Sequence, residues 1–382
     1  MDKHKNEQKI LFFIFLGGLL LRLLSLFNTT LSGDFASYWK IAGNITKGVF
    51  PLLGPVASVN DSFHLGPFFY YFLSIPYLIG NGDYHVAIIF FSIINSLSIY
   101  PLYKVCKRLF SVSQSLKITA LYTFSSYIMS IQSFPWNSYI LPLLNILSLY
   151  CVIQVQKGRS LFVPLLFLCF GISLQAHATA LFVIPIFLLL LPFKKIPLKF
   201  YFAGILLFIL SLSPWIYYDL STNFGQSKAA IAIFQTGKTE QCSIVSYLAN
   251  HGHGERCFSQ IRNTLFVFRL FTMSLFNTQN IVVVMLTIFT VAAILVKGKL
   301  PQRKLFILWI GVPLVLYLFY SSNVYLHYFL ILIPIPFFLM VLLLDKLSVF
   351  GKFGNRLSNL LFAALILLNI WFYIASLHSL RG

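Results

Sequence analysis

The segment Gly33-Asp34-Phe35-Ala36-Ser37-Tyr38-Trp39-Lys40-Ile41-Ala42 begins a few residues after the first long apolar run of the chain, residues 10–27. That run is long enough to cross a bilayer as a helix. Asp34, Tyr38 and Ala42 recur at helical spacing, which predicts one face of a short helix. Only 9 of the 382 residues are acidic, so an aspartate at this boundary is conspicuous. A carboxylate just outside a membrane suits an enzyme whose substrate is attached to a lipid.

The composition is that of a membrane protein. The chain is 58% hydrophobic and 10% charged, with a mean hydropathy of +0.84, far from the values of a soluble domain. Apolar runs of roughly 20 residues recur from end to end. The sequence therefore predicts an all-α, polytopic bundle of about eleven transmembrane helices. The candidate spans are residues 10–27, 84–104, 116–134, 138–156, 160–176, 178–193, 198–217, 279–297, 305–322, 325–345 and 357–377.

The placement of lysine and arginine gives the orientation. With the N-terminus in the cytoplasm, every second loop is basic and most of the 28 basic residues are cytoplasmic, as the positive-inside rule requires. The short, proline-interrupted segment 67–80 is therefore expected to be a re-entrant or surface helix on the outer face. The first span is expected to be a retained anchor, with Arg22 reaching up to the interface or, as the alternative, contacting a lipid phosphate. The net charge of +19 then reflects topology, and nucleic acid is not an expected partner.

The expected organisation is a single transmembrane domain, residues 1–382, with helical outer-face loops, two of them long. The first outer loop is residues 28–83 and contains Asp34, and the second is residues 219–278. Cys242 and Cys257 lie in the second loop, in a compartment that permits oxidation, so a disulfide between them is predicted, with two unpaired thiols as the alternative. No P-loop, no serine esterase elbow and no paired-cysteine zinc motif is present in the sequence.

Several motifs along the chain resemble those of one enzyme family. They are Asp34…Tyr38-Trp39…Ala42, His64-Leu65-Gly66-Pro67-Phe68-Phe69-Tyr70-Tyr71, Trp136-Asn137, Gly171…Gln175-Ala176-His177, Pro214…Asp219 and His327-Tyr328…Pro334. In order and spacing the series resembles the membrane glycosyltransferases of the GT-C fold, in the branch of the protein O-mannosyltransferases and the aminoarabinose transferases of lipid A (glycosyltransferase family 39-like). The resemblance implies a polyprenyl-phosphate sugar donor, a catalytic aspartate in the first outer loop and inversion at the anomeric carbon.

The chain departs from the pattern of this family at two positions. Phe35 stands where many members have a glutamate after the first aspartate, and Asn137 stands where many have a second acid. With few carboxylates nearby, no cofactor and no obligatory divalent ion is expected. Many members also carry a soluble C-terminal domain, whereas a membrane-only version is expected here.

The residues can be assigned roles from the chemistry of glycosyl transfer. The acceptor must lose a proton to a base, and Asp34 is the first candidate, with a helix N-cap as its alternative role. His64 is the second candidate. The departing phosphate needs cations or hydrogen-bond donors. The residues expected to bind substrate are Tyr38, Lys40, His64, Asn137, Gln175, His177, Arg256, Arg262, His327 and Tyr328, and Arg269 is a further candidate phosphate contact.

The predicted function is that of a multi-pass glycosyltransferase of the cell membrane with its active site on the extracytoplasmic face. Its expected partners are membrane lipids, the polyprenyl-phosphate-linked sugar donor and a lipid, glycan or protein acceptor. Gln175, His177 and His327 have an alternative role as interhelical hydrogen-bonding groups. A transporter or lipid flippase is the alternative function, and a structural subunit of an envelope-assembly complex is a third. A transporter is expected to have polar groups at the centres of its spans, which this sequence has in small number.

Overall fold

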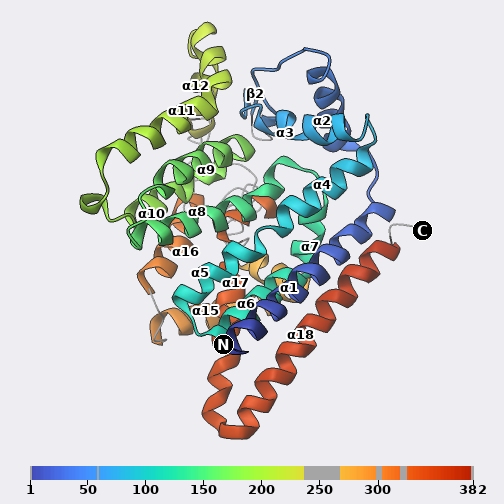
Figure 1. The fold of residues 1–382 in the computed structure, drawn as a ribbon, viewed down its shortest axis with the longest axis vertical. Helices are drawn as coiled ribbons and strands as arrows, with labels where there is room; N and C mark the ends of the chain where they lie inside the picture. Colours follow the sequence, from blue (N-terminus) through green and yellow to red (C-terminus); the bar gives the residue numbers. More distant parts are fainter. Residues whose placement is uncertain (1, 58–59, 236–266, 298–302, 319–324, 380–382) are drawn as a thin grey trace, which may run out of the picture.

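The computed structural model describes residues 2–57, 60–235, 267–297, 303–318 and 325–379, and these residues are almost entirely helical (Figure 1). The prediction of an all-α bundle of apolar helices is confirmed. The first part contains α1 (Asp2–Leu23), the 3-10 helix η1 (Leu24–Phe27), α2 (Gly33–Ile45), α3 (Phe68–Ile79), α4 (Tyr84–Ser96), α5 (Ile99–Leu109), α6 (Val112–Phe124), α7 (Ser126–Ser133), η2 (Asn137–Ile140) and α8 (Leu141–Gln156). The second part contains α9 (Phe162–Ala176), η3 (Ala178–Phe182), α10 (Ile184–Leu189), η4 (Phe193–Lys195), α11 (Leu198–Ser221), α12 (Gly225–Gln235), α15 (Ile281–Lys297), α16 (Arg303–Leu318), η6 (Leu326–Leu332), α17 (Ile335–Lys346), η7 (Leu347–Phe350) and α18 (Gly351–Ser379).

The number of spans differs from the expected eleven. Among the described residues, five helices are long and apolar enough to cross a membrane: Lys5–Phe27, Tyr84–Leu109, Asn137–Gln156, Leu198–Ser221 and Ile335–His378. A bent pair, Val267–Phe276 and Ile281–Ala292, meets at 104° and would bring the number to six. The count of about eleven is therefore not confirmed, although the apolar helices indicate a multi-pass membrane protein.

Local breaks explain part of this difference. The expected span 116–134 divides into α6 and α7 at Ser125, whose hydroxyl accepts a hydrogen bond from the Ile128 N–H (3.3 Å) and donates one to the Ser274 carbonyl (2.6 Å). The expected span 325–345 divides into η6 and α17 at Pro334, because proline has no N–H and disfavours helix in the residue before it. A capping side chain or a proline can therefore end a helix inside a sequence that is apolar throughout.

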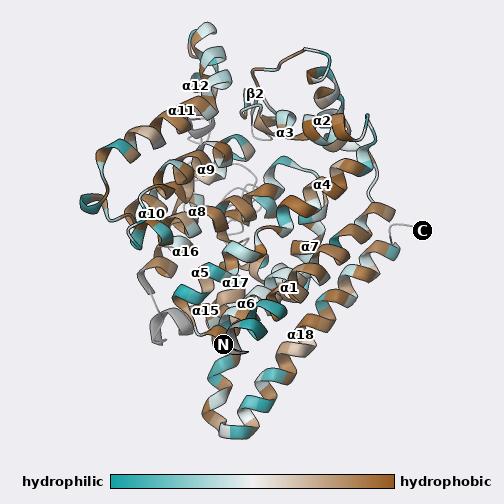
Figure 2. Cartoon of the chain, in the orientation of Figure 1, coloured by the Kyte–Doolittle hydropathy of each residue, from teal (hydrophilic) through white to brown (hydrophobic). Residues whose placement is uncertain are grey.

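The long peripheral helices present their hydrophobic side chains outward. Only 6% of the apolar part of α11 is buried, and hydrophobic residues predominate along α1, α11 and α18 (Figure 2). Large exposed side chains on these helices include Phe13, Phe202 and Trp371. Such surfaces match a hydrocarbon environment, where apolar side chains need no cover from protein.

Arg22 was expected to reach the membrane interface, and this prediction is wrong. Its side chain is fully buried and points into the bundle between α1, α6 and α7. The guanidinium donates to Gln132 Oε1 (2.6 and 3.2 Å), to the Gly18 carbonyl (2.9 Å) and to the Thr123 carbonyl (3.2 Å). Gln132 in turn donates to the Tyr122 hydroxyl at 2.5 Å. Arg22 stays inside because these acceptors satisfy its donors, as buried charges require.

The first predicted outer loop and α12, which belongs to the second, lie at one end of the molecule, where α2, α3, β2 and α12 gather (Figure 1). The first includes a two-stranded antiparallel sheet that the sequence did not predict, β1 (Val56–Ala57) and β2 (Asn60–His64), with Val56 opposite His64. The Gln226 side chain of α12 accepts a hydrogen bond from the His64 N–H (2.7 Å) and donates one to the Ser62 carbonyl (3.2 Å). These bonds tie the second loop to the first.

Candidate active site

Asp34 lies in the first turn of α2, on the solvent-exposed side of that helix. Ser32 occupies the N-cap position of α2. The Asp34 carboxylate accepts a hydrogen bond from Trp136, so Asp34 does not serve as the N-cap. Phe35 and Tyr38, which flank it on the helix, are buried. The helix that the sequence predicts is therefore present, with its apolar residues packed inward and its carboxylate turned away from them.

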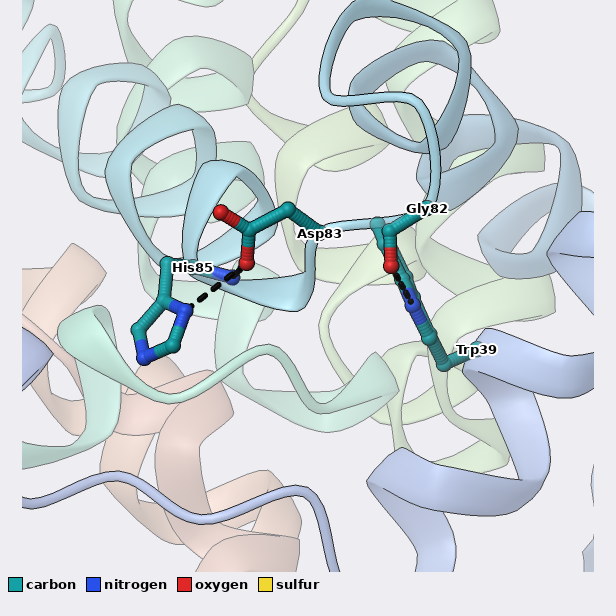
Figure 3. Close-up of polar contacts among 4 residues, drawn as sticks. All are labelled: Trp39, Gly82, Asp83 and His85. Atoms are coloured by element: carbon teal, nitrogen blue, oxygen red, sulfur yellow. Dashed lines mark hydrogen bonds and ion pairs between the residues drawn. The ribbon is translucent and has the colours of Figure 1, made fainter.

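The buried side of α2 is anchored to the turn before α4. The Trp39 indole donates a hydrogen bond to the Gly82 carbonyl at 3.1 Å (Figure 3). Beside it, the Asp83 carboxylate accepts hydrogen bonds from the backbone N–H (3.0 Å) and Nδ1 (2.7 Å) of His85, and so caps α4 (Figure 3). Tyr77 of α3 packs against Trp39 with ring centroids 4.9 Å apart. These contacts fix the orientation of α2 and hence the position of Asp34.

A cavity of about 210 Å³ opens beside Asp34. Its walls come from segments that are far apart in the sequence: α2, the β1–β2 hairpin, the turn before α8, the start of η3, α12, α16 and η6. The lining residues are mostly apolar or aromatic, and Asp34 is the only Asp, Glu, Lys or Arg among those described. The polar lining residues, with Tyr and Trp counted among them, are Asp34, Tyr38, Trp136, Asn137, Ser138, His177, Thr179, Tyr317, His327 and Tyr328.

Trp136 positions the carboxylate of Asp34. The indole Nε1–H donates to Asp34 Oδ2 at 3.1 Å, and the indole ring packs edge-on against the His327 ring, with centroids 4.6 Å apart. Oδ1 has no hydrogen-bond partner among the described residues, so it is available to a ligand in the cavity. The arrangement holds one oxygen and leaves the other to accept a proton.

Tyr38 and Asn137 form the wall next to Asp34. The Tyr38 hydroxyl donates to Asn137 Oδ1 at 3.5 Å, and Asn137 Nδ2 donates to the Ala176 carbonyl at 2.8 Å, which fixes the orientation of the amide. Burial and, next, the charge of Asp34 raise the pKa of Tyr38 above its ordinary value. The same two causes raise the pKa of Tyr70 to about 12. Both phenols are therefore protonated at neutral pH.

His177, His327 and Tyr328 form an aromatic cluster in the lining of the same cavity. The His177 ring centroid lies 5.4 Å from that of His327 and 4.7 Å from that of Tyr328. Burial lowers the pKa of His177 to about 4, so this ring is neutral at pH 7. Its Nδ1 lies 2.9 Å from Thr179 Oγ1. The cluster therefore offers neutral hydrogen-bonding groups and ring faces to a ligand.

The structure thus brings together Asp34 and five of the residues expected to bind substrate: Tyr38, Asn137, His177, His327 and Tyr328. Lys40 is exposed on α2 and does not line the cavity. Gln175 is buried outside the lining, where it accepts from the Phe68 N–H (3.1 Å) and donates to the Ser211 carbonyl (2.8 Å). Gln175 therefore joins α9 to α3 and α11.

His64 also lies outside the lining of the cavity, with both of its backbone polar groups engaged. Its N–H donates to Gln226, and its carbonyl accepts from Trp215 Nε1 at 2.9 Å. Its Nδ1 atom is buried and has no hydrogen-bond partner among the described residues. Arg256, Arg262, Cys242 and Cys257 lie outside the described residues, so their predicted contacts stay predictions.

Several lining residues were not predicted as site residues, among them Trp136, Ser138 and Thr179. Trp136 belongs to one of the sequence motifs, but only the folded chain shows its indole N–H beside Asp34. Thr179 follows His177 by two residues. His177 is the N-cap residue of η3, and its side chain accepts a hydrogen bond from the Thr179 N–H. Ser138 is fully buried, and its hydroxyl has no partner among the described residues. In the part of the chain that the structure describes, no three His, Cys, Asp or Glu side chains gather as a metal site.

The fold is a helical bundle of the GT-C type. Among solved structures, the chain is similar to the archaeal oligosaccharyltransferase AglB from Archaeoglobus fulgidus, solved in complex with an inhibitory peptide and a dolichol-phosphate. The TM-score is 0.58 and the sequence identity 13%; the match covers 99% of this chain and 56% of the AglB chain. No protein-family model and no curated protein matches the sequence. At this identity the likeness shows the fold alone.

Proposed function

We propose that this protein is an integral-membrane glycosyltransferase that moves a sugar from a polyprenyl-phosphate donor to a hydroxyl or amine acceptor on the outer face of the membrane. One observation carries the proposal: in a GT-C fold, the carboxylate of Asp34 lies on the wall of a cavity lined mainly by apolar and aromatic residues. AglB, whose fold is similar, was solved with a dolichol-phosphate bound. The proposed acceptor is a glycolipid, a polysaccharide or a protein.

In the proposed reaction, the acceptor oxygen or nitrogen attacks C1 of the donor sugar. The bond between C1 and the phosphate oxygen breaks, and its electron pair leaves with the polyprenyl phosphate. Asp34 takes the acceptor proton as general base, through the oxygen that Trp136 does not hold. A single displacement of this kind inverts the configuration at C1.

The leaving phosphate needs neutralising groups because its negative charge grows in the transition state. We propose Arg256 and Arg262 as cationic contacts, whereas Lys40 lies outside the cavity lining, and we propose no divalent ion as an obligatory partner. Hydroxyl, amide and imidazole groups of the cavity wall supply neutral donors, among them Tyr328 and His177. Asp34 is the single carboxylate of the described lining.

The direct test is turnover by purified protein in lipid. The protein is incubated with a panel of polyprenyl-phosphate sugars and simple hydroxyl or amine acceptors, and release of polyprenyl phosphate is followed over time. We expect release from at least one donor, dependent on acceptor. A transporter or flippase would instead carry the intact donor across the bilayer without cleaving it. Movement of the donor with no release from any member of the panel would contradict the proposal.

A further inference from the structure

The ring of His177 is fixed through its Nδ1 atom at the junction of α9 and η3. Nδ1 lies 3.3 Å from the backbone nitrogen of Thr179 and 2.9 Å from Thr179 Oγ1, so the ring caps η3. The His177 backbone N–H donates to the Ser173 carbonyl at 2.9 Å, which secures the last turn of α9. Both the chain and the ring of His177 are therefore held in one position.

This geometry determines the tautomer of the ring. A backbone N–H can only donate a hydrogen bond, so Nδ1 must present its lone pair to Thr179, and the Thr179 hydroxyl donates to the same lone pair. In a neutral imidazole the proton then resides on Nε2. Because burial keeps the pKa of His177 near 4, the neutral form is the one present at pH 7.

The Nε2–H group is the hydrogen-bonding group of the ring that Thr179 leaves unused. It has no hydrogen-bond partner among the described residues, although His177 lines the same cavity as Asp34. The titratable groups packed against the ring are His327 and Tyr328, at 5.4 and 4.7 Å between centroids. A donor with a fixed direction and no protein partner at a cavity wall is a binding feature for an oxygen acceptor.

We propose that His177 contacts the substrate as a neutral hydrogen-bond donor, with Nε2–H donating to an oxygen of the donor phosphate, and that Thr179 is the positioning residue that sets this tautomer. The identity of the acceptor oxygen rests on the proposed function. The bond strengthens as the phosphate gains charge in the transition state. A neutral donor supplies this stabilisation without placing a cation that would pair with Asp34 and weaken it as a base.

The positions of the protons on the ring leave His177 no role as a second base. Its Nδ1 lone pair is occupied by Thr179, and Nε2 already carries a proton. The acceptor proton goes to Asp34, the electron pair of the broken C1–O bond goes to the phosphate, and the imidazole is neutral before and after the reaction. His177 therefore changes the stability of the leaving group and transfers no proton.

Two substitutions separate this role from a structural one. His177→Asn keeps an oxygen that can cap the Thr179 N–H, since asparagine is a good N-cap, but removes the Nε2–H donor. His177→Gln extends an amide N–H toward the position of Nε2. We expect both variants to fold with similar melting temperatures, the Asn variant to lose about 10²-fold in kcat with little change in KM, and the Gln variant to retain more turnover. Wild-type kcat in the Asn variant, or a rise in KM alone, would overturn the phosphate contact.

The tautomer is tested independently of turnover by nitrogen NMR of protein labelled with [15N]histidine, the His177 signals being assigned by their loss in His177→Asn. We expect a non-protonated Nδ1 and a protonated Nε2 at pH 7, both in the wild-type protein and in Thr179→Val, because the backbone N–H at position 179 that fixes the tautomer is kept in that variant. A protonated Nδ1 in the wild-type protein would overturn the inference. If no donor is turned over but this signature is present, the proposed function fails and the fixed donor remains.

Discussion

Replacing Asp34 by asparagine removes the proposed base while conserving the shape of the side chain. The Asn oxygen can still accept the Trp136 indole hydrogen bond, now 3.1 Å long to Oδ2, so the local structure is expected to persist. Because the side chain is exposed, we expect the free energy of unfolding to change by less than about 1 kcal/mol. General-base catalysis contributes about 10²–10⁴-fold, equivalent to about 3–5 kcal/mol in activation free energy. Turnover should therefore fall by that factor.

The assay is the initial rate of polyprenyl-phosphate release in lipid, measured beside a melting curve for each protein. Asp83→Asn is the matched control, because Asp83 is another exposed aspartate near α2 and asparagine caps α4 as well as aspartate does. A second readout is the titration of Tyr38. Burial and the charge of Asp34 both raise the pKa of this phenol, so removing the charge should lower its pKa while the effect of burial remains. Near-normal turnover by Asp34→Asn, with Asp83→Asn equally active, would refute the assignment of the base.

Three further predictions concern the rest of the chain. Arg22→Leu deletes four buried hydrogen bonds and leaves buried acceptors unpaired, at about 1–3 kcal/mol for each, so it should lower the melting temperature in detergent; an unchanged melt would contradict the network. On intact cells, a membrane-impermeant thiol reagent should label Ser62→Cys and spare Ser113→Cys, and labelling of position 113 alone would invert the topology. Cys242 and Cys257 should resist alkylation until reduced, since a disulfide closing a loop of about 15 residues contributes roughly 3 kcal/mol, and two freely alkylated thiols would exclude it.

The helical fold and part of the site follow from local sequence patterns. Hydrophobic runs give the apolar helices, and the spacing of Asp34 and Tyr38 gives the short helix α2 that carries the carboxylate. The length of each span was less predictable, because one serine at position 125 or one proline at position 334 divides an apolar run without changing its hydropathy. Composition therefore predicts the class of fold better than it predicts where each helix begins and ends.

Polarity near a helix end did not tell which side chains face the cavity. Gln175 and His177 are two residues apart, yet the first joins three helices through hydrogen bonds and the second lines the cavity. The difference arises because α9 ends between them and His177 takes an extended backbone conformation. The role of Trp136 depends on a contact with Asp34, 102 positions earlier in the chain, which no local pattern encodes.

The central claim is that a sugar passes in one displacement from a lipid phosphate to an acceptor deprotonated by Asp34. The most direct measurement is the anomeric configuration of the isolated product, determined by NMR after turnover of a donor of known configuration. We predict a glycosidic product whose configuration at C1 is opposite to that of the donor. A product with retained configuration would contradict the single displacement.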